Sequence, residues 1–120
     1  MNQRLVVKAT TGMDAPERCS QAFTVAAMAA AAEVPVSLWL TGESAWYAVV
    51  GKAHEFVLPH SAPLADLLAQ VLAAGQVTLC TQCAARRAIE PREMIGGIRI
   101  AGAAAFVAEI TAPNTQAIVY

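Results

Sequence analysis

The sequence lacks the features that mark several large classes of protein. Only 14% of its 120 residues are charged, with eight basic and nine acidic side chains spread along the chain, so no basic surface for nucleic acid is predicted. Hydrophobic residues make up 57% of the chain, but many of them are alanine. No apolar run approaches the roughly 18 to 20 residues of a spanning helix. We therefore expect neither a nucleic-acid partner nor a membrane.

Cysteine is scarce, with three residues in the whole chain. An odd number of cysteines, together with an amino terminus that has no export signal, indicates a reducing, cytoplasmic location. A structural zinc site needs two ligand pairs, and only Cys19, His54 and His60, at irregular spacing, could complement Cys80 and Cys83. We expect no metal and no other cofactor.

The common glycine motifs of nucleotide and ester chemistry are also missing. The chain has no Gly-x-Gly-x-x-Gly fingerprint, no Gly-x-x-x-x-Gly-Lys phosphate loop and no Gly-x-Ser-x-Gly elbow. Nucleotide binding and serine-hydrolase chemistry are therefore not predicted, and the cysteines become the leading candidates for chemistry.

What the sequence does contain is an alternation of strand and helix signals. Strands are predicted over 5–10, 34–40, 77–80, 98–100 and 116–120, and helices over 16–33, 44–50, 64–74 and 102–109. Parallel strands need crossover connections, which these helices supply. The predicted fold class is α/β: a three-layer sandwich with a mainly parallel central sheet of about five strands and helices on both faces, in one domain over 1–120.

The most informative segment is 77–87, in which an apolar strand ends on Cys80 and is followed by Cys83 and two arginines. We expect both cysteines in the turn from strand to helix or in the first helical turn. Backbone N–H groups there, with positive charge from Arg86 and Arg87, should lower the pKa of a thiol. Cys19, within an alanine-rich helix, is expected to be buried and slow to react.

The spacing Cys-x-x-Cys indicates sulfur or redox chemistry, with Cys80 and Cys83 as candidate catalytic residues. Binding sites in open α/β sheets lie beyond the carboxyl ends of the strands. The candidate substrate-binding residues are found in the turn after the first strand, behind the cysteines and in the loop 51–62: Thr11, Gly12, Arg86, Arg87 and His54. A non-catalytic binding module whose cysteines only pack remains an alternative.

Several of these segments resemble the DsrE/DsrF/TusD-like sulfur-relay proteins. The resemblance is carried by the Thr-Thr-Gly turn at 10–12, the segment Leu38–Glu43, the helix Leu64–Gly75 and the strand Val77–Cys80 with two arginines behind it. It implies a possible sulfurtransferase that carries sulfane sulfur as a persulfide on Cys80, between donor and acceptor proteins with reactive thiols. Relatives with a second cysteine, as at Cys83, are described as peroxiredoxin-like, so a dithiol oxidoreductase is the alternative.

The resemblance also implies a homotrimer or a homohexamer. The high apolar content of the chain also favours self-association, because a small domain can hardly bury all of it. We expect the apolar segment 45–50 to contribute most to this self-association.

Overall fold

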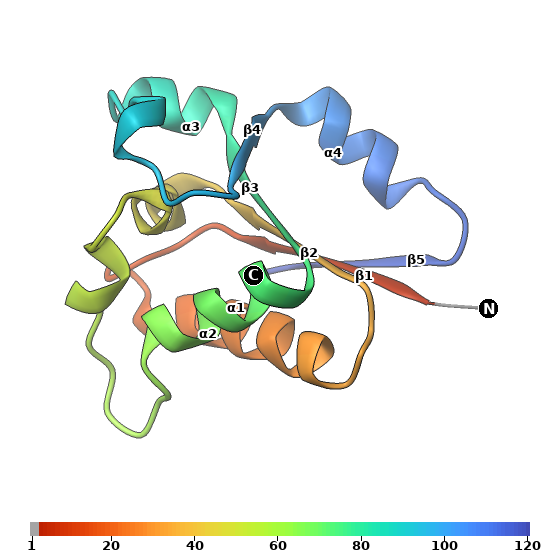
Figure 1. Cartoon of the computed structure of the whole chain (residues 1–120), viewed down its shortest axis with the longest axis horizontal. Coiled ribbons are helices and arrows are strands. Elements are labelled where there is room, and N and C mark those ends of the chain that lie inside the picture. Colours follow the sequence, from red (N-terminus) through yellow and green to blue (C-terminus); the bar gives the residue numbers. More distant parts are fainter. Residues whose placement is uncertain (1–2) are drawn as a thin grey trace.

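The computed structural model describes residues 3–120 and has an α/β fold built on one five-stranded sheet (Figure 1). Every strand pairing is parallel, and the strand order is β4-β3-β2-β1-β5. The predicted fold class is confirmed. The strands are β1 (Arg4–Ala9), β2 (Val36–Leu40), β3 (Gln76–Cys80), β4 (Arg99–Ala101) and β5 (Thr115–Val119).

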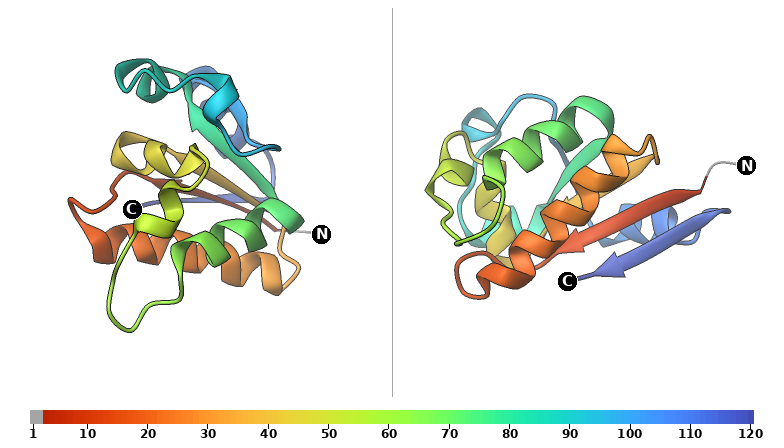
Figure 2. Two further views of the ribbon diagram at one scale, coloured as in Figure 1. Left: turned by 60° about the vertical axis from the view of Figure 1, so that its left-hand side comes forward. Right: turned by 90° about the horizontal axis from the view of Figure 1, so that it is seen from below.

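Helices cover both faces of the sheet. The α-helices are α1 (Pro16–Ala31), α2 (Leu64–Ala74), α3 (Thr81–Arg86) and α4 (Ala103–Ile110), and the 3-10 helices are η1 (Gly42–Ala48), η2 (Lys52–Glu55) and η3 (Pro91–Glu93). α1 and α2 lie side by side on one face, and α4 lies on the other (Figures 1 and 2). The chain advances from β1 to β4 in one direction and then crosses the whole sheet to β5, so a right-handed crossover places α4 opposite α1.

The central strand β2 is buried along its whole length. Val36, Leu38 and Leu40 join the main core, which the sheet forms with α1 and α2. Ser37 and Trp39 point to the other face, since successive side chains of a strand alternate between faces. This arrangement explains why β2 reads as a continuous apolar run.

The face under α4 holds a buried charge. The carboxylate of Glu109, on a residue that is 9% exposed, accepts hydrogen bonds from Ser37 Oγ at 2.7 Å and Trp39 Nε1 at 3.1 Å. It also pairs with Arg4 at 3.3 Å and with Arg99. Burial of a carboxylate is tolerated when its oxygens are bonded in this way. Most of these residues are far from Glu109 in the chain, and their spacing does not predict this network.

Some element boundaries differ from the predicted ones. α1 ends at Ala31, two residues early, because Glu33 has a left-handed φ of 61° in the turn that leads to β2. The helix predicted over 44–50 is the 3-10 helix η1, which begins at Gly42. The loop 51–62 contains a further short helical segment, η2.

The segment 45–50 is mostly buried, so the exposure expected of it was wrong. Ala45 and Ala48 are fully buried and Tyr47 is 6% exposed, whereas Val50 alone is strongly exposed. η1 folds back over the core, and its small and aromatic side chains fill the space there. Other exposed apolar side chains lie on β4, α4 and β5, and some lie outside these elements: Ile100, Val107, Ile118 and Val119 on the former, and Met13, Met28 and Val57 elsewhere.

No helix within residues 3–120 combines the length and the apolar character that crossing a membrane would require.

Candidate functional site

The turns that follow β1, β2 and β3 meet at one edge of the sheet, because these strands are parallel neighbours. The backbone oxygen of Thr11, after β1, accepts a hydrogen bond from Ser44 Oγ in η1. The N–H of Gly42, after β2, donates to Cys83 Sγ in α3 at 3.3 Å. The structure thus brings Thr11, Gly12 and both predicted catalytic cysteines to the same edge.

Cys80 is the last residue of β3 and is partly exposed. Burial by itself raises the pKa of its thiol, but hydrogen bonds from the Cys83 backbone, the Cys83 side chain and the Gln82 backbone outweigh it. The positive charge of Lys8 acts in the same direction, and the net pKa of Cys80 is below its ordinary value. As a thiol, Cys80 donates to Gln82 Oε1 at 3.6 Å. Cys80 is therefore an accessible sulfur with a favoured thiolate form.

Cys83 lies in the first turn of α3, as predicted, and is 8% exposed. Its sulfur accepts the hydrogen bond from Gly42, and its own N–H and thiol stabilise the Cys80 thiolate. The second cysteine is therefore a buried neighbour of the first and far less accessible.

Gly42 is a residue that the sequence reasoning missed. Its φ is +52°, and a Cβ atom built on it would lie 2.2 Å from the backbone oxygen of Thr10. Only glycine allows this left-handed, close approach between the turns after β1 and β2. The sequence Thr41-Gly42-Glu43 after an apolar strand was the available signal.

The two arginines differ in their surroundings. Arg87 donates to Glu43 Oε2 from Nε at 3.0 Å and from a terminal nitrogen at 2.8 Å, and it also bonds the backbone oxygen of Cys83 at 3.2 Å. It therefore fastens α3 to η1. Arg86 is exposed at the end of the same helix.

Arg86 and Arg87 were expected to lower the pKa of a thiol here, but the cation that lowers the pKa of Cys80 is Lys8. Its ammonium lies 4.7 Å from the ring centre of Phe106 on the α4 face. Val77 and Leu79 point into the main core, so alternation places Cys80 on the α4 face as well. In the sequence, the charged Lys8 follows Val7 within the apolar segment that forms β1. The strand order was needed to show that β1 and β3, which carry Lys8 and Cys80, are separated by a single strand.

Thr11 and Gly12 shape the turn after β1. Thr11 Oγ1 donates to the backbone oxygen of Ala15 at 3.2 Å, and the N–H of Gly12 donates to Asp14 Oδ1 at 2.7 Å. A Cβ atom on Gly12 would lie 2.9 Å from the hydroxyl oxygen of Tyr47. The absence of a side chain at Gly12 thus lets this turn close against η1.

His54 is exposed on η2, at some distance from this arrangement. It borders a small cavity of about 120 Å³ with Ala65, Leu68 and Leu72 of α2. None of the other residues that line this cavity comes from the turns after β1, β2 or β3.

Cys19 is fully buried in α1, as expected. Burial raises the pKa of its thiol to about 12, despite a hydrogen bond with Ser44 that lowers it. A thiol with such a pKa is inert near neutral pH.

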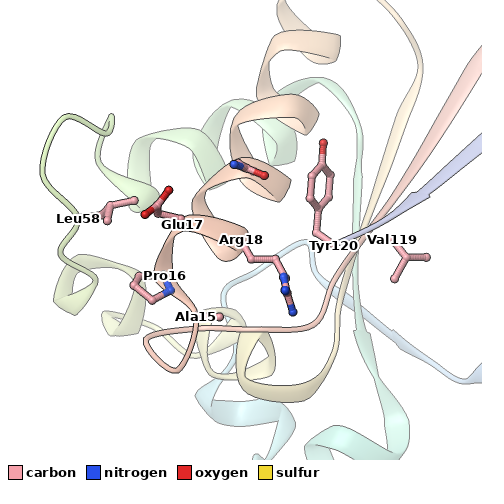
Figure 3. Close-up of a pocket in the computed structure, with 8 residues that line it drawn as sticks. Ala15, Pro16, Glu17, Arg18, Leu58, Val119 and Tyr120 are labelled. Carbon is pink, nitrogen blue, oxygen red and sulfur yellow. The ribbon is translucent and has the colours of Figure 1, made fainter.

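A cavity of about 730 Å³ lies between the start of α1 and the end of β5 (Figure 3). Arg18 and Tyr120 border it, and no cysteine does. Across residues 3–120, no three side chains of the His, Cys, Asp or Glu type are gathered as metal ligands.

Comparisons with known proteins agree with this fold. The model of the DsrE/DsrF-like family matches residues 3–114. The crystal structure of the ychN protein from E. coli superimposes with a TM-score of 0.78 at 18% identity, covering 97% of this chain and 99% of that one. MTH1491 from Methanobacterium thermoautotrophicum, a protein of unknown function, gives a TM-score of 0.67 at 7% identity, covering 99% of this chain and 100% of that one. No curated protein matches the sequence.

Proposed function

The chain belongs to the DsrE/DsrF-like family, and from that premise we propose that it relays sulfane sulfur as a persulfide on Cys80. The family supports a role of the sulfur-relay type. The observation that supports the specific chemistry is the state of Cys80, which is partly exposed at the site edge and has a lowered pKa.

The chemistry needs no oxidant or cofactor. The Cys80 thiolate attacks the outer sulfur of a donor persulfide, the sulfur–sulfur bond of the donor breaks, and the donor leaves as a thiolate. Cys80 then carries the extra sulfur. An acceptor thiolate attacks that outer sulfur, takes it as a new persulfide, and releases Cys80 as a thiolate. The lowered pKa of Cys80 favours both its attack and its departure.

Thr11, Gly12, Arg86 and Arg87 are part of the proposal as residues that shape or border the place where the partner thiol approaches. Gly12 and Arg87 act through the turns that they hold together. Among the candidate substrate-binding residues, His54 has the least support, because it borders a different cavity.

A dithiol oxidoreductase is the second candidate function. Its support is the hydrogen bond that the Cys83 side chain makes to Cys80, which places two thiols next to each other. In that function Cys83 would resolve a mixed disulfide at Cys80. The burial of Cys83 and its bond from Gly42 favour the first candidate, in which Cys83 stabilises the Cys80 thiolate.

The partners in this proposal are donor and acceptor proteins with reactive thiols, in a reducing compartment such as the cytoplasm. We also propose a homotrimer or homohexamer. The exposed apolar side chains on β4, α4 and β5 are the surface that supports self-association.

Mass spectrometry after incubation with a small-molecule persulfide tests the proposal. We expect the wild type to gain one sulfur atom on the peptide that carries Cys80. Cys80→Ser should lose the gain, because a serine hydroxyl cannot form a persulfide, whereas Cys83→Ser should keep most of it. Cys19→Ser is the matched control, with unchanged loading. Loss of loading in Cys83→Ser, together with thiol–disulfide turnover by the wild type, would establish the oxidoreductase instead.

A further inference from the structure

A separate cavity, of about 300 Å³, lies beside the cysteine turns, between the turn after β1 and the helices η1 and η2. We propose that this cavity binds an organic cation, namely an alkylammonium group such as that of a lysine side chain or a free amine. The proposal does not depend on the sulfur chemistry of Cys80. It rests on the walls, the hydroxyl and the carboxylates of the cavity.

The walls are aromatic. Trp46, Tyr47 and Phe56 line the cavity together with the thioether of Met13. Tyr47 and Phe56 meet edge to face, with ring centres 5.9 Å apart, and both are at most 9% exposed. Aromatic faces attract cations through their quadrupoles, and the attraction is stronger where water is excluded.

Tyr47 brings an unused polar group to this cavity. The residue is 6% exposed, yet its hydroxyl exchanges a hydrogen bond with no other residue among 3–120. No buried side-chain nitrogen or oxygen among the described residues lacks a hydrogen-bond partner, so this unpartnered hydroxyl is accessible to solvent. A bound N–H group could donate to its oxygen. Gly12 keeps this oxygen from being covered by a side chain.

The electrostatic surroundings select the charge of the ligand. Burial, Cys19 and the carboxylates of Asp14, Glu43 and Glu55 together raise the pKa of Tyr47 to about 12. Arg87 pairs with Glu43 and Lys52 lies near Glu55, so these three carboxylates exceed the two nearby cations by one negative charge, which favours a cation over an anion.

One carboxylate oxygen at the cavity is open to a ligand. Arg87 uses two N–H groups on Glu43, and both bind Oε2. Within residues 3–120, Oε1 of Glu43 has no hydrogen-bond donor. An ammonium group has three N–H donors and could bond this oxygen while contacting the aromatic walls.

The chain already places one cation of its own at the rim. Lys52 lines the cavity, with its ammonium 3.7 Å from Glu55 Oε2, too long for a hydrogen bond. The Lys52 side chain is 44% exposed, so it can move aside. A ligand ammonium would compete with Lys52 for Glu55.

A titration followed by nuclear magnetic resonance tests the proposal, with the indole N–H of Trp46 as the reporter. The probe is n-butylammonium at neutral pH, and n-butanol and n-butyrate are neutral and anionic probes of the same length. We expect butylammonium to bind about tenfold more tightly than either, given the strength of cation–π contacts. Trp39, which is 1% exposed in the core, serves as an internal control whose indole signal stays in place.

Variants assign the binding to the cavity. Glu55→Gln and Tyr47→Phe should each weaken butylammonium binding by about threefold to tenfold, through the lost charge or hydroxyl. Lys52→Met should strengthen it, because the competing ammonium is removed. Glu33→Gln, a change of the same kind on an exposed residue outside the cavity, should leave it unchanged.

Equal binding of butanol or butyrate would overturn the proposal, as would an unchanged affinity in Glu55→Gln, which is exposed and should fold normally. Lysine capped as N-acetyl-lysine methylamide is titrated in parallel to identify the source of the cation. Tighter binding than butylammonium would support a lysine of a protein partner, and weaker binding would support a free amine. Absence of binding by both cations would refute the site.

Discussion

The backbone N–H of Gly42 donates a hydrogen bond of 3.3 Å to the Sγ atom of Cys83. This contact joins the turn after β2 to the first turn of α3. It fixes the sulfur of Cys83 on one side while the same residue stabilises the Cys80 thiolate on the other. The state of the exposed cysteine thus depends on a glycine in a neighbouring turn.

Gly42→Ala tests this dependence. The left-handed φ of +52° and the approach of 2.2 Å to the Thr10 oxygen leave no room for a methyl group. We expect a loss of about 2 kcal/mol or more in the free energy of unfolding, measured by urea denaturation. Gly51→Ala is the matched control, because Gly51 also has a positive φ but nothing within 4 Å of its Cβ position. Equal losses in the two variants would contradict the steric explanation.

Alkylation rates as a function of pH should separate the cysteines. Thiolate is the reactive form, so a lowered pKa moves the rise in rate at Cys80 to a pH below that of a free thiol. Cys19, with a pKa of about 12, should remain slow throughout the neutral range. The rates are measured peptide by peptide, and similar slow labelling of Cys80 and Cys19 would contradict the prediction.

Lys8→Met should raise the pKa of Cys80, because it removes a positive charge that favours the thiolate. The expected shift is small, since partly exposed charges are screened by solvent. It is read from the pH at which alkylation of Cys80 reaches half its maximum. Lys52→Met, which removes a lysine at another cavity, should leave that pH unchanged.

The sequence predicts most of the fold because its signals are local. The amphipathic pattern of α2 and the apolar run of β3 each lie within one element, and both are found as predicted. The end of β3 at Cys80 is also predicted by a local signal. The order of strands follows from crossover geometry only after the elements are known.

The contacts that lower the pKa of Cys80 and fasten α3 to η1 could not be predicted from local sequence patterns. Lys8 and Cys80 lie on strands separated by β2, and Arg87 bonds Glu43, which is distant in sequence. Such pairs depend on which face each strand presents and on how the turns close. Pairs of this kind leave no periodic pattern in the sequence.

Glu109→Ala should destabilise the protein strongly. The substitution leaves Arg99 and Arg4 without their carboxylate and removes the acceptor for Ser37 and Trp39. We expect a loss of about 3 kcal/mol in the free energy of unfolding, as for other broken, partly buried ion pairs. Glu93→Ala, on the exposed 3-10 helix η3, is the control with a much smaller loss. Comparable losses would mean that the network contributes little.

Self-association should depend on the exposed apolar side chains of the β5 edge. Val119 is 62% exposed, and Val119→Lys would place a charge where we propose another copy packs. Light scattering at micromolar concentration should show a trimer or hexamer for the wild type and a smaller species for the variant. Val50→Lys, at an equally exposed valine far along the chain, should keep the wild-type state. A monomeric wild type would contradict the proposed trimer or hexamer.

The crossover from β4 to β5 has a consequence for folding during synthesis. Arg4 of β1 pairs with Thr115 of β5, so this edge of the sheet can form only after nearly all of these residues have left the ribosome. The strands β1, β2 and β3 and the helix α3 are complete by Arg86. The turns that carry Cys80 and Cys83 can therefore form on a nascent chain before α4 covers the second face of the sheet. At that stage Trp39 still lacks its edge-to-face contact with Phe106.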